Sequence, residues 1–261
     1  SKDDYIVLCD TYIYDEDNKL LPHYSNTRHF CEKEFRLHPK GVEFEFQQDF
    51  YIMDSETRKP YGKSFGLSDN KNYCKVGNGY IHGREIINNV FTQCENVDIH
   101  IHEVCSHNGP SQWTFCVKGT DIDAADQLVL FRYILARVCE NYNAYPSFEP
   151  VPFPGLYPSG LRVQFSTDKM RGNYESVQLV IKNLARHHEK SLSCYGDNSQ
   201  RLGAFHLSQF TFGISKKDVS LVVPHETFQS KKGPVIDTRP AANANPYVVS
   251  QSLMEIIHEN S

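Results

Sequence analysis

The order of hydrophobic patterns along this chain constrains its fold more than any other feature of the sequence. Four segments repeat apolar residues at three and four positions, as amphipathic helices do, and most of the rest alternates like strands. The predicted helices cover residues 83–95, 124–142, 174 to about 193, and about 246 to 258. The predicted strands cover residues 5–14, 42–53, 97–105, 112–117, 161–166 and 220–223. Because these segments do not alternate regularly, the pattern indicates an α+β fold rather than a parallel βαβ sheet.

The chain is expected to form a single domain over residues 1–261. A single core can still grow to about 250 residues, and no internal repeat or low-complexity tract divides the sequence. The proline-rich stretch from Pro146 to Pro158 favours a rigid, extended connection over a flexible linker. Whether the native chain extends upstream of Ser1 is left open by the sequence.

The charge balance excludes a strong global field for binding polyanions. The chain carries 27 basic and 32 acidic residues, a formal charge of −5. Contact with nucleic acid would therefore need a local basic patch, and the pairs Lys216-Lys217 and Lys231-Lys232 are short and separated. No apolar run approaches the ~20 residues that span a bilayer. We expect no contact with a membrane. We also expect an intracellular location, with the cytoplasm as the first choice and an organelle matrix as the alternative.

The eight cysteines are dispersed, without a CxxC pair, so reduced thiols are expected. His100, His102, Cys105 and His107 are candidate zinc ligands, because zinc accepts imidazole and thiolate ligands. However, an H-x-H pair is common by chance, and Cys105 does not share the strand face of the two histidines. We therefore expect no metal there.

Four ordered segments carry a more specific signal than composition. These are GPSQWTF at residues 109–115, QFSTDKMR at 164–171, RLGAFH at 201–206, and KGPVIDTRP at 232–240 followed by NANPYV at 243–248. They resemble, in the same order and spacing, the MPAQWEF, NFSTKAMR, RLTGFH and KGYFEDRRP–NxDPY motifs of glutamine synthetase. Weaker matches upstream lie at residues 5–9, 26–29 and 72–77.

The chain thus resembles the C-terminal catalytic domain of a eukaryotic-type glutamine synthetase over nearly its whole length. The resemblance implies a curved antiparallel sheet backed by helices, lacking the family's N-terminal β-grasp domain. In the family that domain completes the neighbouring subunit's active site within a ring. A ring of identical subunits is therefore doubtful for this chain.

The family's reaction forms γ-glutamyl phosphate from glutamate and ATP, and it uses divalent cations held by carboxylates and a histidine. Seven positions that carry metal ligands or the flap glutamate in the family are changed or altered here: Gln47, Asp49, His107, Thr114, Arg162, Leu207 and Ile236. At these positions only Asp49 keeps a carboxylate, and Arg162 replaces the metal histidine. A guanidinium about 4 Å from a divalent ion repels it by several kcal/mol even at an effective dielectric near 20.

Leu207 stands where the family's flap glutamate faces ammonium, and it can neither take a proton nor offer charge. Thr238 replaces the first arginine of the DRRP motif, and Lys217 and Val222 replace another arginine pair. The resemblance with these changes predicts a pseudoenzyme: not an enzyme, with no catalytic residues, no metal and no cofactor.

Four positions keep binding-type residues of the family. Arg201 matches the arginine that holds the glutamate carboxylate, and Ser166, Arg171 and Arg239 match positions near the nucleotide. Arginines and serines in such segments also cap helices and pair with carboxylates, so a structural role is the stronger expectation for each.

The sequence therefore predicts a catalytically inactive, glutamine synthetase-like protein with a structural or regulatory role in a larger assembly, whose partners are other protein subunits. Two alternatives stay open. One is a sensor that retains weak nucleotide or glutamate binding, and the other is a factor bound to a ribosome or other large particle.

Overall fold

A computed structural model describes residues 5–38, 41–62, 76–77, 80–199, 201 and 207–259 of the chain. The helices are α1 (Thr27–Leu37), α2 (Arg84–Glu95), α3 (Asp123–Glu140), α4 (Asp168–Gly172), α5 (Tyr174–Arg186), α6 (His188–Cys194), α7 (His225–Ser230) and α8 (Pro246–Ile257). The strands are β1 (Tyr12–Tyr14), β2 (Leu20–Pro22), β3 (Glu43–Asp54), β4 (Ile101–Ser106), β5 (Gln112–Thr120), β6 (Ala144–Ser147), β7 (Leu161–Ser166), β8 (Phe212–Ile214), β9 (Leu221–Val223) and β10 (Val235–Asp237).

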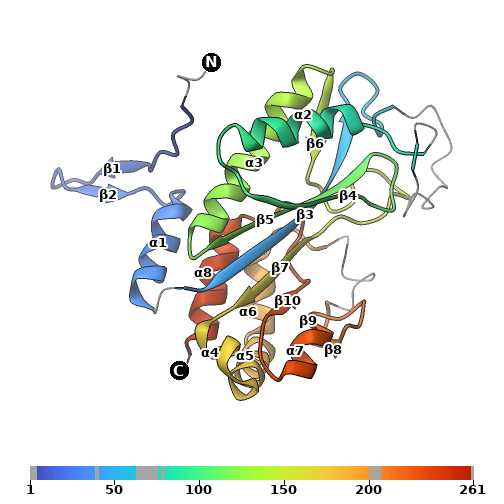
Figure 1. Ribbon diagram of the computed structural model, residues 1–261. Helices are drawn as coiled ribbons and strands as arrows, with labels where there is room; N and C mark the ends of the chain where they lie inside the picture. The colour runs from blue at the N-terminus through green and yellow to red at the C-terminus, as the bar shows by residue number, and fades with distance from the viewer. Residues whose placement is uncertain are drawn as a thin grey trace.

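Eight strands form the central sheet, in the order β4-β5-β3-β7-β10-β9-β8, with β6 also paired to β3. Every pairing is antiparallel except that of β8 with β9. Helices α1, α3 and α8 gather on one side of this sheet (Figure 1). The predicted α+β class, an antiparallel sheet backed by helices, is confirmed.

Period-two alternation along β3 explains how the sheet holds the core. Phe44, Phe46, Phe50 and Ile52 point to the helix side and join one hydrophobic cluster with apolar residues of α2, α3 and α8. The intervening residues of β3 include glutamate, glutamine and aspartate. The strand therefore has an apolar face toward the helices and a largely polar face on the other side.

The helix ends follow local capping chemistry. Asn245 caps α8 by accepting a hydrogen bond from the backbone N–H of Tyr247, and Pro246 occupies the first turn. Gly83 precedes α2 with a φ of +80°, and a Cβ there would lie 2.7 Å from Ile52 Cδ1. Only glycine fits this position without strain.

The helix predicted from residue 174 to about 193 is two helices, α5 and α6. They meet at His187, whose φ of −100° and ψ of 23° leave the helical region. The His187 ring bonds Glu259 at 2.6 Å, beyond the end of α8. Periodicity did not reveal this break, because both helices present apolar residues to the same core.

The strand predicted over residues 5–14 is wrong for its first seven residues, since only Tyr12–Tyr14 is a strand. Its partner β2 makes a two-stranded hairpin that stands clear of the main sheet (Figure 1). The strand predicted from residue 97 begins later, at Ile101, because a turn with Asp98 at a φ of +58° precedes it.

None of the helices in the described parts of the chain is long and apolar enough to cross a membrane. The seven cysteines within those parts are free thiols. The single-domain assignment and the cellular location stay predictions.

Candidate functional site

The polar face of the central sheet brings together four of the seven altered positions that the sequence singled out. Gln47 of β3 lies opposite Arg162 of β7, and Asp49 of β3 lies opposite Thr114 of β5. Because side chains two residues apart share a face, Glu45, Gln47 and Asp49 point to the same side of the sheet. The alternation therefore places these side chains from three adjacent strands around one patch.

Asp49 is the centre of this patch, and the protein itself satisfies its carboxylate. Thr114 donates its hydroxyl to Asp49 Oδ1 at 2.6 Å, and the backbone N–H of Gly160 lies 3.3 Å from Oδ2. Arg162 Nη2 lies 3.8 Å from Oδ1. Asp49 is buried, whereas the Arg162 side chain is 39% exposed. The carboxylate thus binds a hydroxyl, an amide and a guanidinium of its own chain.

The family's divalent cations do not fit the donors that are present. Hard cations require several oxygen ligands, chiefly carboxylates, and no group of three or more His, Cys, Asp or Glu side chains in the described ranges could hold a metal ion. The groups nearest the Asp49 carboxylate are two hydrogen-bond donors, the Thr114 hydroxyl and the Gly160 N–H, and the positively charged guanidinium of Arg162. We derive no chemical step through a metal here.

Sequence reasoning missed two carboxylates on this face, Glu45 and Glu103. Glu45 is buried and accepts hydrogen bonds from Gln47 at 3.0 Å and Gln164 at 3.4 Å. Glu103 of β4 lies opposite Cys116, with Oε2 3.9 Å from Sγ. Burial and these two glutamates raise the pKa of the Cys116 thiol. The signal that could have found them was the alternation of β3 and β4, which motif alignment ignores.

The remaining altered positions are His107, Ile236 and Leu207. His107 follows β4, with Nδ1 3.3 Å from Gln112 Oε1 and its ring centroid 5.4 Å from that of Tyr157. Ile236 lies on β10 opposite Val222 and Gln164, and because Gln164 is in turn opposite Glu45, Ile236 is on the same face of the sheet as the patch. Leu207 is fully buried, and its carbonyl accepts a hydrogen bond from His188 Nε2 at 2.9 Å. Residues 202–206, which complete the RLGAFH motif, are outside the described residues.

Arg201, the matched glutamate-binding residue, is turned into the protein. It is 2% exposed, and it donates to Asn198 Oδ1 at 2.7 Å and to the carbonyls of Pro240 and Thr238 at 2.8 and 3.1 Å. Burial lowers its pKa to about 10. These bonds hold the loop after β10 against the segment that follows α6.

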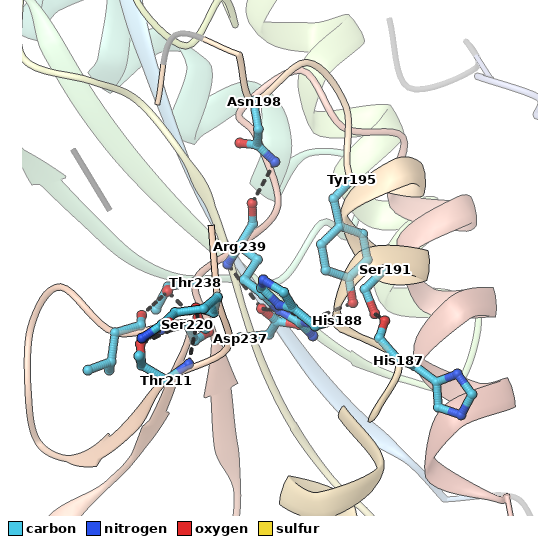
Figure 2. Close-up of polar contacts among 12 residues, drawn as sticks. His187, His188, Ser191, Tyr195, Asn198, Thr211, Ser220, Asp237, Thr238 and Arg239 are labelled. Atoms are coloured by element: carbon cyan, nitrogen blue, oxygen red, sulfur yellow. Dashed lines mark hydrogen bonds and ion pairs between the residues drawn. The ribbon is translucent and has the colours of Figure 1, made fainter. Parts of the chain in front are cut away.

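Arg239 is equally buried and forms a two-pronged ion pair with Asp237. Its Nε and Nη2 bond Oδ1 and Oδ2 at 2.9 and 2.7 Å, and both side chains are 0% exposed. Tyr195 donates its hydroxyl to Oδ2 of the same carboxylate, and His188 Nδ1 lies 3.3 Å from Arg239 Nη1. Figure 2 shows these side chains converging between α6 and β10. The matched nucleotide residue therefore joins a buried structural network.

The protonation state of His188 follows from this network. Arg239 can only donate, so Nδ1 accepts from it, and Nε2 then carries the proton given to the Leu207 carbonyl. Burial lowers the pKa of His188, and the nearby Arg239 charge adds to that shift. A neutral imidazole thus links the flap position to the Asp237–Arg239 pair.

The other two binding candidates, Ser166 and Arg171, lie together beside a surface pocket. Arg171 Nη1 donates to the carbonyl and the hydroxyl of Ser166, each at 2.9 Å, and Nη2 donates to the Gly41 carbonyl at 2.7 Å. The pocket has a volume of about 340 Å³, and its polar lining consists of Gln164, Arg171, Glu226, Thr227, Ser230 and Lys232. It is a second group of candidate binding residues, on the rim of the sheet.

The motif order, the antiparallel sheet and the polar face agree with comparisons to known proteins. The family model "Glutamine synthetase, catalytic domain" matches residues 28–176. A putative glutamine synthetase of Acanthamoeba polyphaga mimivirus is 30% identical over 98% of this chain and 74% of that protein. This chain belongs to the glutamine synthetase family. The Neurospora crassa glutamine synthetase is 33% identical over 90% of this chain and 68% of its own length.

A solved structure supports the fold of this family member. The Plasmodium falciparum glutamine synthetase superposes with a TM-score of 0.72 at 13% sequence identity, covering 95% of this chain. The match spans 57% of the Plasmodium chain. The expected resemblance to the family's catalytic domain is confirmed.

The prediction that the chain is not an enzyme is contradicted by the same comparisons and is wrong on their evidence. Relatives about 30% identical over nearly the whole chain are named glutamine synthetase, which is an enzyme. The prediction rested on the charges at motif-aligned positions, where Asp49 and Arg162 cancel, and on Leu207 at the position of the flap glutamate. Glu45 and Glu103 share the face with that pair, so the face carries more negative charge than the alignment suggested. The individual roles of the seven altered positions stay predictions.

Proposed function

We propose that this glutamine synthetase-family chain is a structural or regulatory component of a larger protein assembly, attached to a different protein subunit by residues 5–24. We call these residues the N-terminal arm. Nine of the eighteen exposed large hydrophobic side chains in the described residues belong to it: Tyr5, Ile6, Val7, Leu8, Tyr12, Ile13, Tyr14, Leu20 and Tyr24. A concentration of exposed apolar side chains of this kind favours an interaction site. This concentration is the observation that carries the proposal.

The arm has little of its own to bury these side chains. It contains only the β1–β2 hairpin, with three paired positions, and a two-stranded hairpin is marginally stable in water. Tyr14 is 69% exposed and Ile13, on the opposite face of the same strand, is 47% exposed. Since both faces of the ribbon are uncovered, a partner surface would stabilise it.

The base of the arm is fixed to the body, so a partner bound to it would be held in a defined place. Asn26 donates to the Thr11 carbonyl at 3.1 Å, and the Tyr12 hydroxyl lies 3.3 Å from His29 Nδ1 on α1. The rings of Tyr12 and His29 also meet edge to face, with centroids 5.8 Å apart. These contacts fix the base of the arm against the N-terminal end of α1.

The chemistry of the arm favours a partner with an apolar groove and a basic rim. The hairpin tip is acidic, with Asp15, Glu16 and Asp17 in succession. A second copy of this chain, with its net charge of −5, is electrostatically a poorer partner than a basic surface. The exposed edges of β1 and β2 can also pair with a strand of the partner.

The test compares the sedimentation of two tagged variants in extract of the source cells. The arm variant combines Ile13→Ser with Tyr14→Ser. The control combines Tyr133→Ser with Phe212→Ser, which are 52% and 57% exposed on other elements. The wild type and the control should migrate in a large particle, and the arm variant should migrate near its own mass of 30.0 kDa.

Three outcomes would reject the proposal. The wild type could migrate alone as a monomer, or as a particle that contains only copies of itself. Alternatively, the arm variant could stay in the particle. Circular dichroism and the melting temperature of the arm variant should match those of the wild type, because its two substitutions lie outside the core.

A second candidate function, nucleotide binding, is favoured by the pocket beside Arg171. Lys232 is a cation in its lining that suits an anionic ligand, whereas Arg171 is already paired with Asp168 and Glu226 adds a carboxylate to the lining. Its volume of about 340 Å³ falls within the range of small-molecule sites. The Lys232 ammonium forms no ion pair within the described ranges. Glutamate binding has less support, since the matched residue Arg201 is buried and bonded to its own chain.

Calorimetry with ATP and ADP tests this second candidate, with and without magnesium. Binding should weaken in Lys232→Gln and stay unchanged in the control Lys182→Gln, an exposed lysine on α5. If neither nucleotide produces heat or a thermal shift, the pocket is not a nucleotide site.

A further inference from the structure

A second cavity lies between α4, α5, the end of α8 and the start of β3. It has a volume of about 220 Å³. Its lining includes the apolar side chains of Val42, Met170, Leu179, Val180 and Ile257. It shares no lining residue with the pocket beside Arg171, and none of the candidate catalytic or binding residues lines it, although four of its residues belong to the QFSTDKMR segment. Neither the proposed assembly nor nucleotide binding uses it.

The size and lining of this cavity select a small apolar group. An apolar cavity of about 150 Å³ stays dry and binds benzene, whereas drug-sized ligands occupy about 300 Å³ or more. Val42, Met170, Val180 and Ile257 are all buried, so their positions are fixed by the main core. A ligand here would therefore carry one ring, or an aliphatic chain of similar volume.

At the mouth of the cavity, the ammonium of Lys169 is a charge without an ion-pair partner among the described residues. Asp168 pairs with Arg171, and His38 pairs with Glu34 at 2.7 Å. His258 donates through Nδ1 to the Met254 carbonyl and stacks on His38, with ring centroids 4.2 Å apart.

The charge of Lys169 reaches the His258 ring at the mouth. Burial lowers the pKa of His258, and the nearby His38 and Lys169 add to that shift. Asp168, Glu34 and His38 are the other titratable groups at this corner, where Asp168 pairs with Arg171 and Glu34 bonds His38. Lys169 is thus the group at the mouth that is available to an anion.

We propose that this cavity binds a small carboxylate whose apolar body is about one ring in size, with the carboxylate directed to Lys169. The apolar walls take the ring, and the lysine takes the charge. Neutral ligands of the same shape would bind more weakly, and cationic ones most weakly. Lys169 and Met170 lie within the QFSTDKMR segment, but neither is one of the candidate site residues that the sequence singled out.

The experiment titrates the full chain with three probes of one shape, benzoate, benzyl alcohol and benzylammonium, observed by ligand-detected NMR. Benzoate should bind most tightly. Lys169→Gln should weaken benzoate about fivefold, the equivalent of ~1 kcal/mol for two charges about 4 Å apart in water. The same substitution should change the affinity for benzyl alcohol by less than about twofold, because this neutral ligand has no Coulomb interaction with Lys169.

Two controls separate this site from adventitious binding. Lys182→Gln removes an exposed lysine elsewhere on α5 and should leave benzoate binding intact. Val180→Phe should abolish binding of both benzoate and benzyl alcohol by filling the cavity, and Leu179→Trp, at the more exposed edge, serves if that variant does not fold. Absence of benzoate binding, or benzoate binding that Lys169→Gln does not weaken, overturns the proposal.

Discussion

Replacing Asp237 by leucine would test whether the motif arginine Arg239 is a structural residue. The change leaves the Arg239 guanidinium, which is 0% exposed, without its carboxylate partner. It removes two charge-assisted bonds of 2.9 and 2.7 Å and the acceptor of the Tyr195 hydroxyl. Breaking a buried pair by removing one partner costs about 3–5 kcal/mol, because the remaining charge stays buried.

The assay is the melting temperature of the purified chain. For a protein of this size, a loss of about 3–5 kcal/mol corresponds to a decrease of roughly 6–20 °C. Adding Arg239→Met to Asp237→Leu should restore at least half of the loss, since the uncompensated charge disappears. Arg186→Met, which breaks an exposed pair with Glu259 at 3.5 Å, should cost about 0–1 kcal/mol.

The structural interpretation of Arg239 fails if Asp237→Leu lowers the melting temperature no more than Arg186→Met does. It also fails if the double variant is as unstable as the single one, because the cost would then not come from an unpaired charge.

Two further predictions concern stability. The pKa of His188 is lowered in the folded state, so its neutral form stabilises the fold above the unfolded pKa of about 6.5, and this contribution is lost as the pH falls below that value. The melting temperature of the wild type should therefore exceed that of His188→Gln by less at pH 5.5 than at pH 7.5. An equal difference at both pH values would refute the neutral link to Leu207. Gly109→Ala would place a Cβ 2.0 Å from the Tyr51 hydroxyl and should lower the free energy of unfolding, measured by chemical denaturation, by about 1–3 kcal/mol. Gly172→Ala, whose Cβ would have no atom within 4 Å, should leave that free energy nearly unchanged. Equal effects of the two substitutions would show that the Tyr51 contact is not rigid.

The sequence predicted the elements that are fixed by local pattern. The strand over residues 161–166 has the bounds that were predicted, and the helix over 246–258 is one residue shorter. Both have strong apolar periodicity, and Pro246 marks the helix start. The sequence reasoning did not predict helix α1, although Asn26 caps it, because only Cys31 and Phe35 of its residues are buried.

Tertiary pairing decided the elements that the sequence did not predict. Strands β2, β6, β8 and β10 have three or four residues each, too few for an alternating pattern to be read. The region over residues 5–11 has the composition of a strand but no sheet partner. β-propensity reflects packing on neighbours, so it overestimates strand content where neighbours are absent.

Motif alignment located the candidate site but did not show how its residues interact. It identified Asp49, Thr114 and Arg162, which the structure places on one face. It did not predict that Arg201 and Arg239 are buried and bonded internally, since those bonds go to carbonyls and to Asp237 rather than to a motif. Glu45 and Glu103 were missed because they occupy no motif position.

The central claim, attachment of this family member through its arm, is most directly tested by site-specific photo-crosslinking in the source cells. A photoreactive phenylalanine analogue replaces Tyr14 on the arm in one variant and Tyr133 on α3 in the other, both exposed. If the arm attaches the chain to a partner, the analogue at position 14 should crosslink to one different protein that also co-sediments with the chain, and the analogue at position 133 should not crosslink to that protein. Attachment through the arm is contradicted if the analogue at position 14 crosslinks only to other copies of this chain, or to no protein.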